Sequence, residues 1–500
     1  MESKPRIVKA IRLMFACFLV IGLALCLTPA MVAHADAVEV VTNINDSGTG
    51  SLRQAIADVD PGGTITFDVP IPATPSGAGH ATITLTTGEL TINKNLTITG
   101  LGANLLTISG NNTSGVFSCA PGLLINISGV TVANGRASSG GGIFNAGSTI
   151  VLDHCSVINN TTTNGHGGGI YNSTAPLVLN YCIISGNTTS EGSNGGGIYS
   201  SGELTISDST VSGNSTGKGI NVAGDAGDGG DGGGIYSTQN LTLVNTTVSG
   251  NTTGRGGDGQ VNGGDGGDGG GIYSSGELTI SDSTVSGNST GRGGDGSQGS
   301  DGDDGNGGGI CDATGDDSVH MKGTIVAHNL AAGMGPDCYG TIVSHGCNLI
   351  EDTTDCTVTG DQTGNIYGQD PLLGPLADNG GPTQTHALLF ASPAIDAVID
   401  CDCTTIDGDP VTQDQRGMRR PEDGDMDRTA YCDIGAYEKQ PISVGGIVEQ
   451  VDLVQPGVVT DEPHDATTTN SWLPLWIGLA SAFAVGVGIV AYLRLTARAR

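Results

Sequence analysis

The chain contains 500 residues, of which 85 are Gly, and only 4% of its residues are aromatic. Acidic residues outnumber basic ones by 51 to 19, and the formal net charge of −32 argues against nucleic acid and anionic membrane surfaces as partners. The glycines follow no Gly-X-Y period and Pro occurs only 19 times, so the composition excludes a collagen-like chain.

Residues 1–35 have the order of a secretory signal peptide. Basic residues from Lys4 to Arg12 precede an apolar run over 13–27, and the small residues Ala33 and Ala35 follow. The apolar run is shorter than the roughly 20 residues that a membrane span needs, which favours a cleaved signal over an uncleaved anchor. We therefore expect export, with cleavage after Ala35.

Residues 36–80 are expected to cover the N-terminal end of the repeat region that follows. Ser51 and Gln54 fit a helix capping box, and the short helix would bury Leu52, Ala55 and Ile56. A strand and one helix can cover the open end of a stacked β structure. The run Ser-Leu-Arg-Gln-Ala-Ile that starts at Ser51 also resembles the N-terminal segment of bacterial surface β-helix proteins.

Residues 81–336 are a repeat region. The phrase Gly-Gly-Gly-Ile places isoleucine at positions 143, 170, 198, 235, 272 and 310, in steps of 27, 28, 37, 37 and 38 residues. In each repeat, short runs such as Leu204 to Ile206 alternate apolar and polar residues, and a corner precedes the next run at Val211. Because no helical pattern intervenes, the repeat predicts an all-β solenoid. Each repeat would form one turn, with equivalent strands stacked in parallel about 4.8 Å apart.

The longer steps carry their extra residues at one place, between Ser-Gly-Asn and the next Gly-Gly-Gly-Ile. The insertions should therefore leave the solenoid from one corner, and the alternatives are flexible solvated loops, which we favour, or ordered calcium sites. Residues 263–268 fit the start of a calcium-binding Gly-Gly-x-Gly-x-Asp nonapeptide, but Gly270 stands where an apolar residue is expected. The candidate calcium ligands are Asp225, Asp228, Asp231, Asp258, Asp265, Asp268, Asp295, Asp301, Asp303 and Asp304.

One asparagine occupies the same register in successive repeats. An inward ladder of side-chain amides is the favoured interpretation, and glycosylation sequons are the alternative. The residues are Asn160, Asn187, Asn214, Asn251 and Asn288.

Twelve cysteines occur, two of them in the signal peptide, and an exported chain can form disulfides. Cys155 and Cys182 would be neighbours on adjacent turns, where either a disulfide or a buried pair of thiols is expected. The other candidate pairs are Cys338 with Cys356, and Cys401 or Cys403 with Cys432.

Residues 337–440 are interpreted as terminal coils followed by a separate module. Five motifs occur in order here, among them Ser392-Pro-Ala-Ile-Asp396, Asp414-Gln-Arg-Gly417 and Asp433-Ile-Gly-Ala-Tyr-Glu438. Together they resemble the choice-of-anchor Q domain, although Val398 and the insert after Cys401 depart from its pattern. The resemblance implies a bacterial surface protein with a right-handed, pectin-lyase-like parallel β-helix, a nearby anchor and no established chemistry.

The C-terminal residues predict such an anchor. Residues 441–471 are a linker, 472–493 lack charge and are long enough to span a bilayer, and 494–500 form a basic tail. Trp472, Trp476 and Tyr492 suit the membrane interfaces, and the arginines suit the cytoplasmic side. We expect a single-pass membrane protein with an extracellular body.

The repeats provide little that indicates catalysis. Asp208 and Asp282 recur in equivalent turns without a nearby Lys or Arg in sequence, and Asp153 with His154 indicates a turn. Tyr171, Tyr199, Tyr236 and Tyr273 share one register and indicate a structural stack. The basic run 416–420 is expected to pair with Asp414, Asp423 or Asp425.

The expected function is therefore that of a non-catalytic, adhesive or envelope-structural surface protein. An extracellular glycan or protein ligand is the expected partner, and calcium is the only cofactor considered. The alternative is a surface polysaccharide lyase or glycoside hydrolase on the same fold.

Overall fold

The structure is a computed structural model that describes residues 38–72 and 79–441. The predicted signal peptide, the membrane helix, the basic tail and nearly all of the linker lie outside the described residues. Within the described ranges, no helix combines the length and apolar character needed to cross a membrane.

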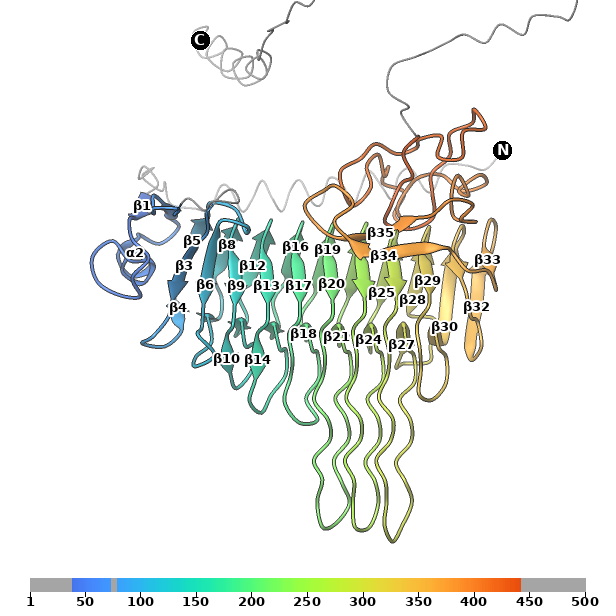
Figure 1. The fold of residues 1–500 in the computed structure, drawn as a ribbon, viewed down its shortest axis with the longest axis horizontal. Helices are drawn as coiled ribbons and strands as arrows, with labels where there is room; N and C mark the ends of the chain where they lie inside the picture. Colours follow the sequence, from blue (N-terminus) through green and yellow to red (C-terminus); the bar gives the residue numbers. More distant parts are fainter. Residues whose placement is uncertain (1–37, 73–78, 442–500) are drawn as a thin grey trace, which may run out of the picture. The chain divides into compact units, whose positions relative to one another are not determined.

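The described chain winds into a parallel β-helix, as the repeat predicts (Figure 1). Two rows of strands form one continuous sheet. The first row contains β4 (Leu90–Ile92), β7 (Phe117–Cys119), β11 (Ile143–Asn145), β15 (Ile170–Asn172), β18 (Ile198–Ser200), β21 (Ile235–Ser237), β24 (Ile272–Ser274) and β27 (Ile310–Asp312). The second row contains β1 (Val38–Val41), β2 (Thr64–Phe67), β5 (Leu96–Thr99), β8 (Leu124–Ser128), β12 (Thr149–Asp153), β16 (Leu177–Asn180), β19 (Leu204–Ser207), β22 (Leu241–Val244), β25 (Leu278–Ser281), β28 (Val319–Lys322), β30 (Cys338–His345) and β32 (Cys356–Asp361).

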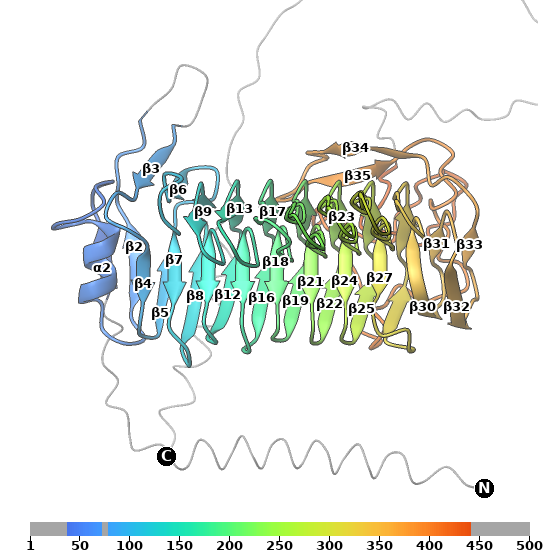
Figure 2. The same cartoon turned by 90° about the horizontal axis from the view of Figure 1, so that it is seen from below.

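The third row forms a sheet of its own, and Figure 2 shows successive coils side by side in sequence order. It contains β3 (Ala81–Thr84), β6 (Leu106–Ser109), β9 (Thr131–Ala133), β13 (Ser156–Ile158), β17 (Ile183–Ser185), β20 (Thr210–Ser212), β23 (Thr247–Ser249), β26 (Thr284–Ser286), β29 (Ile325–Ala327), β31 (Leu349–Ile350) and β33 (Ile366–Tyr367). The short strands β10 (Arg136–Ala137) and β14 (Thr161–Thr162) pair at a corner. The coils thus continue to Tyr367, beyond the repeat phrase.

The register between coils aligns equivalent residues of the repeat. Ile198 pairs with Ile235, and Ile235 with Ile272, while Leu204 pairs with Leu241 in the second row. These side chains point inward and are at most 1% exposed. The apolar core is therefore a set of stacked aliphatic ladders.

The three glycines of the phrase are required by close backbone packing. Gly232 has φ of +64°, a conformation that residues with a Cβ rarely adopt. A Cβ on Gly233 would lie 2.3 Å from the carbonyl oxygen of Gly270, and one on Gly234 would lie 2.7 Å from that of Gly271. The phrase is thus part of the scaffold.

The asparagine ladder is confirmed. Each Nδ2 donates to Oδ1 of the next asparagine at 2.9 or 3.0 Å, and the same Oδ1 accepts the preceding asparagine's backbone N–H. The ladder continues to Asn329, whose Nδ2 donates to Asp337 Oδ1 at 2.9 Å. Because these amides are buried, they are unavailable for glycosylation.

The N-terminal helix α2 (Leu52–Asp58) forms where expected, and Leu52, Ala55 and Ile56 are buried. Ser51 Oγ accepts the Gln54 N–H at 3.2 Å, which is half of a capping box. The other half is absent, because the Ser51 N–H donates to Gly48 O at 3.1 Å and the Gln54 amide donates to Asp58. The helix and β1 pack at the first coil.

The C-terminal module, residues 370–441, packs against the outer face of the third row (Figure 1). It contains an antiparallel pair, β34 (Leu373–Ala377) and β35 (Thr385–Leu388). The threonine at the start of β20, β23 and β26 bonds to the module: Thr210 to Gln384 O (2.6 Å), Thr247 to Gln415 Oε1 (2.6 Å) and Thr284 to Ala436 N (3.1 Å). The strands β20, β23 and β26 of the third row are therefore buried on both faces.

Buried ion pairs hold the module internally and to the solenoid. Arg416 pairs with Asp414 at 2.7 Å, as expected. Arg420 contacts Asp282 of the solenoid at 3.2 Å and Glu438 at 3.1 Å. Asp282 has no Lys or Arg nearby in sequence, and its basic partner lies 138 residues further along the chain.

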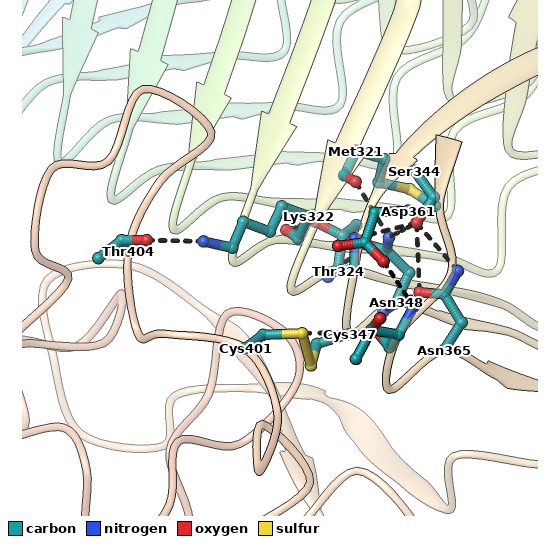
Figure 3. Close-up of a disulfide and its surroundings, with 12 residues drawn as sticks. Met321, Lys322, Thr324, Ser344, Cys347, Asn348, Asp361, Asn365, Cys401 and Thr404 are labelled. Carbon is teal, nitrogen blue, oxygen red and sulfur yellow. Dashed lines mark hydrogen bonds between the residues drawn. A yellow bond between two sulfur atoms is a disulfide. The ribbon is translucent and has the colours of Figure 1, made fainter. Parts of the chain in front are cut away.

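Three disulfides form in the last coils and the module. Cys338 pairs with Cys356, as expected, and Cys403 pairs with Cys432, which decides between the two alternatives. Cys401 pairs with Cys347, a partner that the sequence analysis did not consider (Figure 3). Near this disulfide, Lys322 Nζ donates to Thr404 Oγ1 at 2.6 Å, a second link between solenoid and module.

The disulfide considered between Cys155 and Cys182 is absent, and the alternative of two buried thiols is correct. The two Sγ atoms donate to the carbonyl oxygens of Ile127 and Leu152 at 3.4 and 3.5 Å. Burial raises the pKa of the Cys155 thiol to about 11, so both act as small apolar core residues.

Replacing Asn251 with alanine should lower the free energy of unfolding by about 3 kcal/mol or more, because several buried partners lose their hydrogen bonds. The exposed Asn164→Ala is the control and should change stability by less than about 0.5 kcal/mol. Thermal and denaturant unfolding of both variants measure the difference. Equal effects would contradict the ladder's role.

Arg420→Gln should destabilise the protein by about 3–5 kcal/mol, because Asp282 and Glu438 keep their buried charges without a cation. Arg419→Gln is a neighbouring control, since its side chain is 81% exposed and its ion pair spans 3.7 Å. Unfolding curves of the two variants test this, and an unchanged curve for Arg420→Gln would show that the buried pairs do not hold the module.

Candidate binding surface

Three insertions project together from one corner of the solenoid, on the side away from the C-terminal module (Figure 1). We call residues 217–231, 254–268 and 291–306 the three arms. Within each arm the outgoing and returning segments bond to each other, for example Gly264 N to Gly257 O at 3.0 Å. Neighbouring arms are also bonded, as from Gly257 N to Gly227 O at 2.9 Å. The arms therefore form one hydrogen-bonded unit.

Glycine allows this packing because backbone meets backbone with no side chain between. A Cβ on Gly264 would lie 2.0 Å from Gly227 O, and a Cβ on Gly267 would lie 2.0 Å from Gly230 O. The close contacts recur every third residue, the period of an extended polyproline II chain. The remaining position in each triplet carries the polar side chain.

The aspartates of the returning segments form rows across the arms. Asp265 N donates to Asp228 Oδ1 at 2.9 Å and Asp303 N to Asp265 Oδ1 at 2.8 Å. A second row runs from Asn194 through Asp231 and Asp268 to Asn306, with N–H to Oδ1 distances of 2.6–2.9 Å. Carboxylate and amide oxygens thus have the same structural task, which is to accept the next arm's N–H.

Burial and neighbouring groups shift the pKa of three arm carboxyls in different directions. Burial raises the pKa of Asp231 to about 6 and also raises that of Asp268. On the outgoing segments, Asp258 is exposed, and the Asp295 N–H and the Lys218 ammonium lower its pKa. Asp231 is therefore partly neutral near pH 6, whereas the lowered pKa of Asp258 keeps that carboxyl charged.

The outgoing segments carry a mixed charge pattern. Arg255 lies 3.0 Å from Asp258 and 3.2 Å from Asp295, while Lys218 lies 3.3 Å from Asp258. Beside the third arm, a solvent-open hollow of about 910 Å³ contains Arg255, Arg292, Asp295, Asp301, Asp303 and Asp304 among its lining residues. This hollow could hold a polar ligand that offers both donors and acceptors.

The arms differ from the flexible solvated loops that the sequence favours. They are hydrogen-bonded rather than loose, and their carboxylates are spread along rows. In the described part of the chain, no three of the ten candidate aspartates bring oxygens within 4.8 Å of one another. Calcium binding by the arms stays a prediction.

The tyrosines of the first row stack face to face with Phe144 at one end. Ring centroids of successive members lie 4.7–5.2 Å apart, with interplanar angles of 9° or less. The members are Phe144, Tyr171, Tyr199, Tyr236 and Tyr273. Because the inner ring faces cover one another, the stack leaves mainly ring edges for a sugar, and it is structural as expected.

The residues considered for catalysis are separated. His154 adopts φ of +50° in a corner and bonds to Asp153 at 3.0 Å, as expected of a turn. Burial raises the pKa of Asp208 to about 6, and its carboxylate accepts an Asn245 amide hydrogen bond at 3.2 Å. A hollow of about 510 Å³ between solenoid and module contains His154, Tyr181 and Asp378.

A serine and a histidine also meet, but inside the contact between solenoid and module. Ser249 Oγ lies 2.8 Å from His386 Nε2, and His386 Nδ1 lies 2.7 Å from Gly374 O. A carbonyl requires Nδ1 to donate, so Nε2 accepts from the serine. Burial lowers the pKa of His386, which keeps the ring neutral in this structural contact.

Among residues 38–72 and 79–441, two side-chain clusters could hold a metal ion, and neither was among the metal ligands predicted from the sequence. One combines His328, Glu351 and Asp370, the other Asp396, Asp423 and Asp425. In the first, His328 Nε2 already lies 3.1 Å from Asp370 Oδ1, as in an ion pair. The sequence feature that could have indicated the second cluster is the Asp-Gly-Asp-Met-Asp run at 423–427.

No family model matches this chain, and no curated protein matches it. Among solved structures, the pectate lyase Pel9A is similar at 14% identity and a TM-score of 0.38, covering 81% of this chain and 98% of that chain. ORF18 of Geobacillus virus E2 is similar at 10% identity and a TM-score of 0.30, covering 66% of this chain and 59% of that chain. These likenesses support no inference about activity.

Gly264→Ala should loosen the arms, because its Cβ would lie 2.0 Å from a neighbouring carbonyl oxygen. Gly224→Ala is the matched control, since no atom lies within 4 Å of its Cβ position. Limited trypsin digestion is the measurement, and cleavage at Lys218, Arg255 and Arg292 should accelerate only in Gly264→Ala. Equal cleavage rates would mean that the arms do not depend on this packing.

Proposed function

We propose that this protein is a non-catalytic, membrane-anchored surface protein, a right-handed parallel β-helix whose arms bind an extracellular partner. The carboxylate rows of the three arms are the observation that carries the proposal. They present regularly repeated charge on a backbone-packed support, and such a surface favours electrostatic recognition of a cationic or strongly polar ligand.

The arrangement of the arms supports a partner with repeated features. Equivalent residues of adjacent arms are joined directly, as Asp228 is to Asp265 and Asp265 to Asp303. A polymer such as a glycan, or a basic protein segment, could contact several rows at once. Because the arms are hydrogen-bonded to one another, little ordering would be needed on binding.

The anchoring part of the proposal rests on sequence. The signal peptide 1–35 and the helix 472–493 predict an extracellular body, and the motifs from Asp370 to Glu438 resemble the choice-of-anchor Q domain. In the structure these motifs lie in the module that packs on the third row, the part of the described chain that precedes the proposed anchor. This order is the one that the resemblance implies.

The alternative is a surface polysaccharide lyase or glycoside hydrolase. The hollow that contains His154, Tyr181 and Asp378 favours it, because titratable groups from solenoid and module meet there. Glycoside hydrolysis ordinarily uses two carboxyl groups across the scissile bond, and Asp378 is the one carboxyl among the lining residues. The non-catalytic proposal therefore has the stronger support.

Protease treatment of intact cells should remove the body of the protein while the C-terminal tail stays cell-associated. Antibodies against each part, used on blots of shaved cells, measure this outcome. An intact body on shaved cells whose other surface proteins are digested would overturn the proposed topology.

Binding should depend on the charges of the arms. The triple change Asp228→Asn, Asp265→Asn and Asp303→Asn retains the Oδ1 acceptors, and we expect it to weaken binding in a screen of glycans and cationic peptides at least tenfold. Asp60→Asn, Asp68→Asn and Asp317→Asn remove three exposed charges elsewhere and form the control. Equal affinity of both triple variants would contradict binding by the arms.

The same glycan panel distinguishes the alternative function. New reducing ends or unsaturated products would establish an enzyme, and His154→Gln should then abolish them. Unchanged glycans agree with the non-catalytic proposal.

A further inference from the structure

Three carboxylates converge at the surface of the C-terminal module, far from the arms in sequence. Asp396, Asp423 and Asp425 each offer an oxygen, and these oxygens lie within 4.8 Å of one another. Asp396 is only 7% exposed, whereas Asp425 is exposed. We call these three residues the module carboxylates.

The hydrogen bonds of the module carboxylates leave one buried oxygen without a partner. Asp396 accepts N–H groups from Tyr431, Gly424 and Asp425 at 2.9, 2.9 and 3.0 Å. Asp423 Oδ2 accepts the Arg428 N–H at 3.0 Å, but Asp423 Oδ1 is buried and receives no donor. A buried carboxylate oxygen without a donor or cation is costly, so binding of a cation by Asp423 Oδ1 would be favourable.

The charge of the cluster is also uncompensated. Among the ion pairs of the described residues, none involves a module carboxylate, although Arg416 and Arg420 pair elsewhere in the same module. Two further carboxyls, Asp400 and Asp427, line the adjoining hollow of about 460 Å³ together with Asp396 and Asp425. Several negative charges thus meet around one solvent-connected space.

We propose that Asp396, Asp423 and Asp425 bind a calcium ion. All the converging atoms are oxygens, which suit hard cations rather than zinc or copper. Ligands of a calcium ion lie at most about 4.6–5.2 Å apart, because calcium–oxygen distances are about 2.3–2.6 Å. The three oxygens lie within 4.8 Å of one another and can therefore contact one such ion. Magnesium prefers a tighter octahedron of about 2.0–2.1 Å. Water from the adjoining hollow would complete the coordination.

The local sequence agrees with this assignment. Asp423, Asp425 and Asp427 alternate as do positions 1, 3 and 5 of an EF-hand loop, and Arg428 at the sixth position has φ of +82°. The EF-hand places its turn-forming glycine at that position. The third carboxylate of the site comes from a distant segment, since Asp396 lies in the turn region after β35.

The position of the site suggests what the ion would do. The loop at 423–428 is followed by Cys432, which is bonded to Cys403, and by Asp433, whose Oδ1 accepts the Asp396 N–H at 2.7 Å. Ile434 then belongs to the apolar contact between module and solenoid. A calcium ion would therefore stabilise the module where it approaches the solenoid.

The test is titration of the full-length protein with Ca²⁺, followed by calorimetry and thermal unfolding. The variant is Asp423→Asn with Asp425→Asn, and the matched control is Asp301→Asn with Asp303→Asn in the third arm, which removes the same charge. The wild type and the control should each bind one equivalent of Ca²⁺ at this site, and the variant should not. The melting temperatures of the wild type and the control should rise with Ca²⁺. In a calcium chelator the variant should melt at or above the wild-type temperature, because it lacks the carboxylate repulsion.

If the two aspartates were purely structural, the variant would melt below the wild type both with Ca²⁺ and with the chelator. A variant that melts at or above the wild type in the chelator alone therefore distinguishes calcium binding from a structural role. Peptide mapping of the three disulfides checks that the variant has folded. Absence of binding and of any melting shift in the wild type would overturn the proposal. The proposal would also be overturned if the arm control lost Ca²⁺ binding and the module variant kept it. That result would place the ion in the arms.

Discussion

The parallel register between successive coils is the constraint on which the rest of the structure depends. Each residue of a repeat pairs with its equivalent in the next coil. A residue type that stabilises one coil at a given repeat position therefore stabilises every coil that repeats it. Aliphatic residues become ladders in the core, and the buried asparagines satisfy both their own amides and the backbone of the preceding corner. A slip of one residue would turn every aliphatic side chain outward, which makes the register self-consistent over all the coils.

The arms extend the same principle into segments with almost no apolar residues. Glycine lets their backbones approach closely, and the aspartates in the rows accept hydrogen bonds from the next arm. Stability there comes from backbone hydrogen bonds across neighbours rather than from burial of large side chains. The aspartates of the arms accept hydrogen bonds between neighbouring arms and also provide negative charge. This charge supports the proposed binding of a polar partner.

The C-terminal module changes the environment of the third row. It buries outward-facing threonines and supplies Arg420 to Asp282, so the solenoid contains polar groups that would be unexplained without it. Two of the three disulfides lie in or reach this module. The module carboxylates lie among these attachments, so a cation there would act on the same contact that the buried ion pairs and the disulfides maintain.

The sequence by itself determined the solenoid, the strand positions, the asparagine ladder and the common origin of the arms. These features follow from local periods, because adjacent coils are related by a constant step and equivalent residues must meet. The α2 cap and the Cys338–Cys356 pair were also predictable from short-range patterns. The path of the inserted arms was not, since a glycine-rich segment has no side-chain periodicity that distinguishes a loose loop from packed backbones.

Only the tertiary structure decided which distant residues meet. Cys347 joins Cys401 over 54 residues and Arg420 joins Asp282 over 138, and in each pair one partner lies in the non-repeating module. The module returns along the outer face of earlier coils, so its contacts depend on how an irregular chain folds back. The gathering of Asp396 with Asp423 and Asp425 has the same origin, because buried charge is concentrated there by a turn and a packing contact that no period in the sequence encodes.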